Sequence, residues 1–280
     1  MKKVIIAGLI VMFLIVILGY SIYAQFTTPL NFSDKITEDV YYVGSDGFGS
    51  YLIRTDEGLI LIDAGPIDLV DTLIDRITSL GFDVEEIKII LNTHAHGDHT
   101  GGNNNIVEIS NALTYINEYD AEAIELSNDI ANCGVFCGSP IEETKVDFRF
   151  SDGDTIRLGD KTLEVIHVPG HTPGNSMVYS NVKGVNVLFS GDTIITNSNY
   201  GHPFFDKEVN SKKIVNSLKK VRTLNLEPDL VLPGAVYTGT TEMNPIKWNV
   251  LSFVSLIRAK IDATDNDLLK RSFELLYNNL

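Results

Sequence analysis

The chain is poor in cysteine and in positive charge, and both shortages limit what the protein can be. Cysteine occurs twice in 280 residues, at Cys133 and Cys137. A spacing of four with no further cysteine gives poor support for a zinc site, whereas a local disulfide and two small half-buried thiols both fit. Lys and Arg total 22 against 37 Asp and Glu, which gives a formal net charge of −15. Because so acidic a surface repels phosphate backbones, we expect no nucleic-acid partner.

Low-complexity tracts and short repeats are also missing from the sequence. With 44% hydrophobic and 21% charged residues, the composition excludes a disordered chain and a coiled coil. A chain of this length is sufficient for one large domain with a substantial core. We therefore expect residues 31–280 to form a single globular domain.

One long hydrophobic run stands at the N-terminus, where Val4 to Ala24 contain no charge. A run of this length can span a bilayer, and the preceding Lys2 and Lys3 favour an N-terminus left in the cytoplasm. The alternative is a signal peptide cleaved before Gln25, although its apolar region is normally shorter. We favour an uncleaved signal-anchor over residues 1–30, which places the globular domain outside the cytoplasm on the membrane. Cleavage would make the protein secreted instead.

Apolar runs and amphipathic stretches alternate along the rest of the chain. Their periodicity predicts two or three strands over residues 40–63, a helix over 69–80 that ends at Gly81, a strand over 84–92, and a strand end followed by a helix over 115–126. A second β-rich part covers 146–192, followed by a helix over 210–224, a short strand over 228–234 and helices from Trp248, with Thr264 as a cap. This order predicts an α/β sandwich with helices on its outer faces and a site where the two sheets meet.

Half of the six histidines gather in the segment NTHAHGDHTGG, residues 92–102, directly after the apolar run IKIIL. Residues two apart on an extended strand point the same way, so His94 and His96 can bind one ion. Gly97 permits a sharp turn that carries Asp98 and His99 toward a neighbouring position. This spacing favours two adjacent metal sites over one.

Two later segments supply further ligand types after strands. HVPGHTPGN places His171 in a turn rich in Pro and Gly, and VLFSGDT places Asp192 in the same way. The neutral ligands His94, His96 and His171 leave the full charge on a zinc ion, which acidifies bound water. The second ion would be held by Asp98, His99 and Asp192, with Asp192 able to bridge the two.

Together these segments resemble the metallo-β-lactamase superfamily. From Val40 to about Gly239 the chain carries LIDAG, HAHGDH, PGHTPG, SGDT and PDLVLPG in the expected order. The resemblance implies an αββα sandwich with a dinuclear zinc centre, whose bridging hydroxide attacks a carbonyl or phosphoryl group. It also implies that Asp63 of LIDAG is a buried support for the ligands and does not bind the metal itself.

The sequence departs from this pattern at one position. Most dinuclear members carry a late histidine after the final strand, often as Pro-Gly-His, where this chain has Ala235. An alanine cannot bind a metal, so the second site is expected to be weakened, with His202 as a candidate replacement or an ordinary loop histidine. We interpret His167 as a structural group or as a support for a metal ligand, and Tyr237 as either an oxyanion donor or an ordinary half-buried tyrosine.

The first hypothesis for function is zinc-dependent hydrolysis of a small molecule. The resemblance implies a carbonyl substrate, with a β-lactam or a lactone ranked first and an ester or thioester possible, and Asp98 as the catalytic proton carrier. The second is a persulfide dioxygenase with one iron held by His94, His171 and Asp192. The third is a catalytically impaired member that still binds metal.

Overall fold

The computed structural model describes residues 35–45, 47–132, 140–194 and 211–236. Several predicted features lie outside these residues: the N-terminal signal-anchor, both cysteines, His202, Tyr237 and the helices from Trp248. Over the described ranges, no helix has the length and apolar character needed to cross a bilayer.

The first sheet has six strands, in the order β1-β3-β4-β5-β6-β7. Its strands are β1 (Val40–Tyr42), β3 (Tyr51–Thr55), β4 (Gly58–Ile62), β5 (Ile87–Leu91), β6 (Leu113–Asn117) and β7 (Phe148–Phe150). The pairs from β1 to β4 are antiparallel, and those from β4 to β7 are parallel. The parallel strands β4, β5 and β6 therefore all end at the same edge of the sheet, which is where Asp63 and the histidine-rich segment begin.

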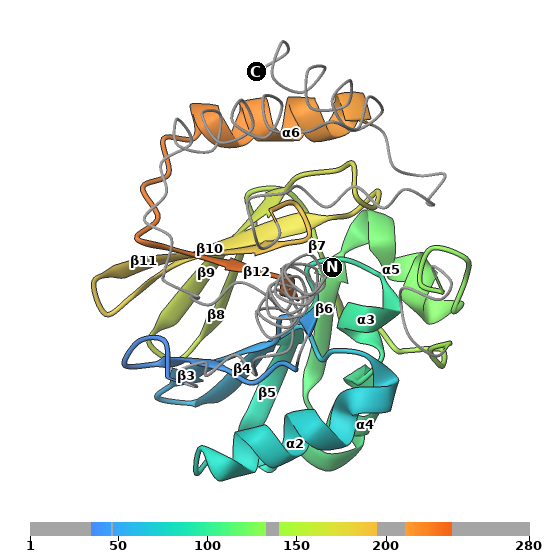
Figure 1. Ribbon diagram of the computed structural model, residues 1–280, viewed down its shortest axis with the longest axis vertical. Coiled ribbons are helices and arrows are strands. Elements are labelled where there is room, and N and C mark those ends of the chain that lie inside the picture. Colours follow the sequence, from blue (N-terminus) through green and yellow to red (C-terminus); the bar gives the residue numbers. More distant parts are fainter. Residues whose placement is uncertain (1–34, 46, 133–139, 195–210, 237–280) are drawn as a thin grey trace, which may run out of the picture.

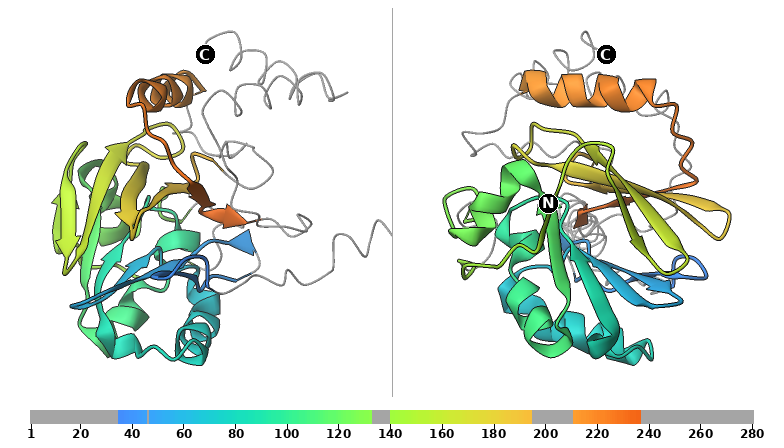
Figure 2. Two further views of the ribbon diagram at one scale, coloured as in Figure 1. Left: turned by 90° about the vertical axis from the view of Figure 1, so that its left-hand side faces the viewer. Right: turned by 180° about the vertical axis from the view of Figure 1, so that it is seen from behind.

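The second sheet has five strands, in the order β12-β11-β10-β9-β8. Its strands are β8 (Thr155–Leu158), β9 (Lys161–His167), β10 (Ser176–Val182), β11 (Val185–Gly191) and β12 (Leu230–Pro233). The short strands β13 (Ala235–Val236) and β2 (Gly47–Phe48) pair with each other, as Figure 2 shows. This pair connects the chain after the second sheet to the loop that precedes β3.

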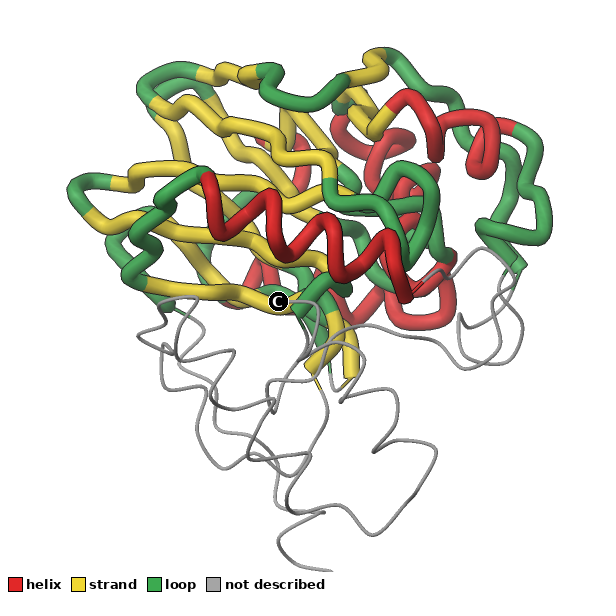
Figure 3. Tube along the Cα trace, turned by 90° about the horizontal axis from the view of Figure 1, so that it is seen from above, coloured by secondary structure: helices red, strands yellow, loops and turns green. Residues whose placement is uncertain are grey.

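The two sheets pack face to face, and helices cover their outer sides (Figure 1). Below the first sheet lie α2 (Val70–Ser79) and α4 (Asn103–Ser110), while α6 (Ser211–Thr223) lies across the strands of the second sheet (Figure 3). The remaining helices are α3 (Gly97–Thr100), α5 (Glu118–Glu125) and the 3-10 turns η1 (Ile67–Leu69) and η2 (Val84–Glu86). The predicted α/β sandwich of two sheets with outer helices is confirmed.

Alternation along β4 shows how the sequence builds these layers. Ile60 and Ile62 pack in the core between the sheets, whereas Leu59 and Leu61 pack in the cluster that includes the buried residues of α2. A strand that is buried on both faces needs an unbroken apolar run, and LILI supplies it. Pairing with β5 places Ile62 opposite Leu91, and Asp63, the next residue, donates its backbone N–H to the Leu91 carbonyl oxygen at 3.1 Å.

Most predicted elements are present, and the differences have identifiable causes. The helix predicted over 69–80 forms as Val70–Ser79, just before Gly81 with a φ of +85°. The strand segment over 146–150 was expected in the second β-rich part, but β7 pairs with β6 in the first sheet. This expectation was wrong because α5 acts as a crossover helix and returns the chain parallel to β6. The short helices α3 and α4 were not predicted.

Candidate metal centre

The histidine-rich segment lies at the edge of the first sheet, after β5. Residues 93–95 form bends, and His96 is the residue that precedes α3, which then carries Asp98 and His99. The expected extended strand at His94 and His96 was therefore wrong, as was the sharp turn at Gly97, which begins a helix. Both imidazoles nevertheless point to the same place, because the chain bends between them.

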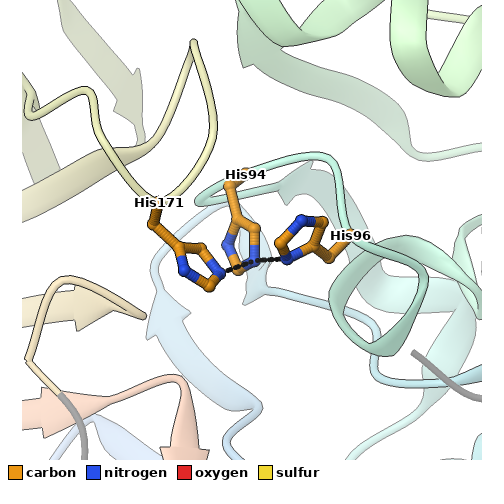
Figure 4. Close-up of side chains that lie close together, drawn as sticks. All are labelled: His94, His96 and His171. Carbon is orange, nitrogen blue, oxygen red and sulfur yellow. Dashed lines mark hydrogen bonds between the residues drawn. The ribbon is translucent and has the colours of Figure 1, made fainter. Parts of the chain in front are cut away.

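Three histidines from two distant segments bring one ring nitrogen each to a common point (Figure 4). His94 Nε2 lies 3.1 Å from His96 Nδ1 and 3.2 Å from His171 Nε2. Two nitrogens bound tetrahedrally to one zinc ion, each at roughly 2.0–2.1 Å, would be separated by roughly 3.3 Å. The spacing of these three nitrogens therefore fits a single zinc ion, and all three side chains are buried. We call His94, His96 and His171 the first group.

A second group consists of His94, His99 and Asp192, whose ligand atoms lie within 4.8 Å of one another. Asp192 belongs to the second group and also faces His171 of the first group. Its Oδ2 is 3.5 Å from His171 Nε2, and its Oδ1 is 3.4 Å from His99 Nε2. Each oxygen of this carboxylate thus faces a different group, which is the arrangement that a bridging ligand requires.

Asp98 lies beside the second group, in the first turn of α3. Its Oδ2 is 3.7 Å from His99 Nε2. Among the described residues, three buried atoms here have no hydrogen-bond partner: Asp98 Oδ1, His99 Nε2 and Asp192 Oδ1. Buried polar atoms are nearly always paired, so three unpaired ligand atoms in one place fit a cation that they would share.

Hydrogen bonds from behind orient two of the histidines. Asp63 Oδ2 lies 2.8 Å from His99 Nδ1 and accepts from Thr93 Oγ1 at 2.7 Å, and its Oδ1 accepts from the Thr93 backbone N–H. Since the Thr93 hydroxyl donates to Asp63, it accepts from His94 Nδ1, 3.1 Å away. Both histidines therefore use Nδ1 for the contact behind the site and direct Nε2 toward it. The role of Asp63 as a buried support is confirmed.

The charges around the site also favour a cation. Burial lowers the pKa of His94 well below its usual value, and the neighbouring His99, His171 and His96 lower it further, so this ring is neutral. Burial would also lower the pKa of His99, but the carboxylates of Asp63, Asp98 and Asp192 raise it well above its usual value. Burial would raise the pKa of Asp192, yet His99 holds it at about 2. The carboxylates of the second group therefore attract positive charge.

Three residues at the site were missed in the sequence. Thr93 holds the His94 ring, Asp120 accepts hydrogen bonds from the segments that carry His94–His96 and His171, and Gly234 packs directly against the second group. A Cβ on Gly234 would lie 2.6 Å from His99 Cε1 and 2.8 Å from Asp192 Oδ1. The position of the late histidine, Ala235, lies in β13 and is 7% exposed. The Pro-Gly-Ala sequence was the one signal that marked this corner as unusual.

His167 belongs to neither group. Its Nε2 lies 2.8 Å from the carbonyl oxygen of Pro173, and its ring stacks on Tyr119 with the centroids 5.3 Å apart. The prediction of a structural group is confirmed, because these contacts hold the loop that carries His171. A pocket of about 520 Å³ lies between this loop and α6, and its lining includes His167 and Tyr119 but none of the candidate ligands.

Known proteins share both the sequence pattern and this fold. Residues 50–234 match the family model of the metallo-beta-lactamase superfamily. The hydroxyacylglutathione hydrolase of Gloeothece citriformis is 34% identical over 143 residues, which cover 50% of this chain and 47% of that protein. An N-acyl homoserine lactonase of a Bacillus species is 26% identical over 200 residues, covering 61% of this chain and 74% of the lactonase. The chain spans about half the length of several curated relatives that it matches.

A solved structure extends the likeness to nearly the whole chain. BJP-1, a subclass B3 metallo-beta-lactamase of Bradyrhizobium japonicum, is 28% identical with a TM-score of 0.62, and the match covers 91% of this chain and 94% of BJP-1. The family match is consistent with the two-sheet sandwich and with the buried groups of His and Asp residues. The chain therefore belongs to the metallo-beta-lactamase superfamily, with candidate metal-binding residues at the edge where its sheets meet.

Proposed function

We propose that this protein is a zinc-dependent hydrolase that cleaves a carbonyl substrate. The observation that carries the proposal is the position of Asp192, which directs one oxygen to His171 of the first group and the other to His99 of the second. This geometry supports two adjacent ions with one shared ligand. Names of relatives that denote hydrolases support the same reaction class.

The first group is the stronger candidate site. Its three buried imidazole nitrogens have the mutual spacing that a tetrahedral zinc site requires. When bound, such an ion supplies Lewis acidity that polarises a carbonyl group and activates a water molecule near neutral pH. The second group would be completed by Asp98, whose unpaired Oδ1 is buried beside His99.

Residues of this chain would carry out proton transfer and hold the ligands in position. Asp98 takes a proton from the attacking water and delivers it to the leaving group, because its Oδ1 has no hydrogen-bond partner and, unlike Asp192, it does not face ligands of both groups. Asp63 and Thr93 hold His94 and His99 through Nδ1, so that Nε2 of each ring is directed toward the site. Gly234 closes the site from the side of β13.

For the substrate class, we propose a β-lactam or a lactone first and an ester or thioester second. All of them form a tetrahedral oxyanion on attack, so one site geometry serves each. The predicted signal-anchor would place the domain outside the cytoplasm on the membrane, where β-lactams and lactone signals are more accessible than a cytosolic thioester.

A second candidate is supported by one further contact. His171 Nε2 lies 3.2 Å from His94 Nε2 and 3.5 Å from Asp192 Oδ2, so these three residues could also hold a single iron ion. This arrangement would suit a persulfide dioxygenase. The unpaired atoms of Asp98 and His99 favour the hydrolase, since one iron would leave them unused.

One experiment separates the candidates. The purified chain is analysed for bound metals and assayed on a chromogenic β-lactam, a lactone, a thioester and a persulfide. Bound zinc with turnover of the lactam or lactone supports the proposal. Bound iron with oxygen uptake on the persulfide overturns it in favour of the dioxygenase, and metal without turnover on the panel supports the impaired member.

A further inference from the structure

A buried carboxylate outside both metal groups connects the two segments that supply the first group. Asp120 lies in the first turn of α5 and is 0% exposed. Its Oδ2 accepts hydrogen bonds from the Ala95 backbone N–H at 3.0 Å and from Thr172 Oγ1 at 2.5 Å. Its Oδ1 accepts from the Gly174 backbone N–H at 2.6 Å. One side chain thus binds two segments that are more than 70 residues apart in the sequence.

Two of the three donors are next to candidate ligands in the sequence, and the third, Gly174, is three residues after His171. Ala95 lies between His94 and His96, and Thr172 follows His171. Both segments consist of bends and turns, so no regular ladder of hydrogen bonds sets their separation. The other backbone connection, from Ser176 N–H to the Thr93 carbonyl oxygen at 2.9 Å, lies closer to the strand ends. Asp120 therefore connects the two segments at residues that are next to the candidate ligands in the sequence.

Gly174 and the Asp120 side chain approach each other closely. A Cβ on Gly174 would lie 2.7 Å from both Cβ and Cγ of Asp120, so only glycine allows the backbone N–H at this position to reach the carboxylate. A fully buried carboxylate is costly unless several donors surround it. Here three donors do so, and all three come from the loops that carry the first group.

We propose that Asp120 is a positioning residue that sets the distance between the His94–His96 segment and the His171 loop, and so controls the affinity of the first group for zinc. The inference rests on the proposed function, since it takes these three histidines as a zinc site. Asp120 does not touch the ligand atoms. It acts by fixing the backbone on either side of them.

The test is a titration of the metal-free full chain with Zn²⁺ in competition with a chromophoric chelator. Asp120→Asn is expected to weaken the tightest zinc-binding step by about 10-fold to 100-fold, the usual effect of removing an outer hydrogen-bond partner. An asparagine has one accepting oxygen and one donating NH₂ group, so one side of it must face a donor. Zinc binding by folded Asp120→Asn that is as tight as in the wild type would overturn the inference.

A matched pair at Thr172 gives an answer even if Asp120→Asn does not fold. Thr172→Ser keeps the hydroxyl donor and should retain wild-type affinity, whereas Thr172→Val removes the donor at similar size and should weaken binding several-fold. Equal affinities for the two variants would overturn the inference. The outcome that wild-type protein binds no zinc would instead refute the proposed function.

Cobalt separates positioning from simple stabilisation. The visible absorption spectrum of the Co²⁺-loaded protein reports the ligand geometry, so Asp120→Asn and Thr172→Val should change the band positions and intensities. A lower unfolding temperature with an unchanged cobalt spectrum and unchanged zinc affinity would show that Asp120 only stabilises the fold, and this outcome would overturn the proposal.

Discussion

Two clusters of charged residues, each with buried members, lie at opposite ends of the sandwich, and their buried polar atoms differ in how they are paired. The Asp39 cluster consists of Asp39, Arg54, Lys161 and Lys183. It lies near the start of β4 and at the start of β9, whereas the metal centre lies beyond the ends of these same strands. Both clusters connect the two sheets, and both contain buried ionisable groups.

In the Asp39 cluster, both carboxylate oxygens are paired. Oδ1 of Asp39 accepts from Arg54 Nη2 at 2.6 Å, and Oδ2 lies 3.1 Å from Lys161 Nζ and 3.2 Å from Lys183 Nζ. The side chains of Asp39 and Lys161 are each 3% exposed. Within the part of the chain that the structure describes, the metal centre instead leaves three buried atoms without a hydrogen-bond partner. The comparison shows that this fold can satisfy buried charge where structure alone is required, so the unpaired atoms at the other end indicate a ligand.

The largest predicted effect concerns the first group. His96→Ala removes one of three converging nitrogens, so bound zinc should fall below detection and activity below about 1% of the wild type. Lys88→Ala, on the exposed side of β5, is the matched control and should retain both. Metal analysis and the substrate assay measure the result. A metal-free His96→Ala protein with full activity would refute the assignment.

The next largest effect concerns the stability that the Asp39 cluster contributes. Asp39→Ala leaves Asp160 as the remaining carboxylate beside the buried Lys161 ammonium and removes the carboxylate to which Arg54 donates, so the free energy of unfolding should fall by about 1–3 kcal/mol while zinc binding is retained. Glu38→Gln, at an exposed position where Glu38 pairs with Lys183, should change the free energy of unfolding much less, because solvent screens an exposed ion pair. Urea unfolding at neutral pH measures both changes. Equal losses in the two variants would contradict the distinction.

Acid should act on the Asp39 cluster in a defined window. Burial would raise the pKa of Asp39, but hydrogen bonds from Arg54, Lys161 and Lys183 outweigh it and lower the pKa to about 2, against 3.8 for an ordinary aspartate. Because the folded-state pKa is lowered, its stabilisation is present above about pH 4 and is lost as the pH falls toward 2. The expected contribution is about 2 kcal/mol.

Unfolding measured between pH 4 and 2 tests this contribution. Asp39→Asn removes the titrating group, so its stability should depend less on pH in this window than that of the wild type. Identical pH dependence in the two proteins would show that Asp39 is not the group responsible.

The smallest effect concerns the second group. Gly234→Ala places a methyl group 2.6 Å from His99 Cε1, so the weaker zinc-binding step should lose about 10-fold in affinity while the tighter step changes little. A substitution at the neighbouring residue, Ala235→His, should have the opposite effect and raise the occupancy of the second group by zinc if this position faces it. Calorimetric titration with Zn²⁺ resolves the two steps. Loss of the tight step in Gly234→Ala would contradict the separation of the groups.

The sequence was sufficient for the parts of the site that depend on local pattern. His94 and His96 follow the apolar run of β5. His171 and Asp192 follow β9 and β11, which both run antiparallel to β10 and therefore end at the same edge of the second sheet. Asp120 could not be predicted in this way, because it accepts from loops 25 and 52 residues away that come together only after folding. The same holds for β7, whose sheet depends on the crossover through α5.

The central claim is that three histidine nitrogens converge on one ion. Anomalous diffraction at the zinc absorption edge, from crystals of the zinc-loaded protein, tests it most directly. The account predicts an anomalous peak about 2.0–2.1 Å from His94 Nε2, His96 Nδ1 and His171 Nε2 together. A fully loaded crystal whose zinc peaks all lie away from these three atoms would contradict it.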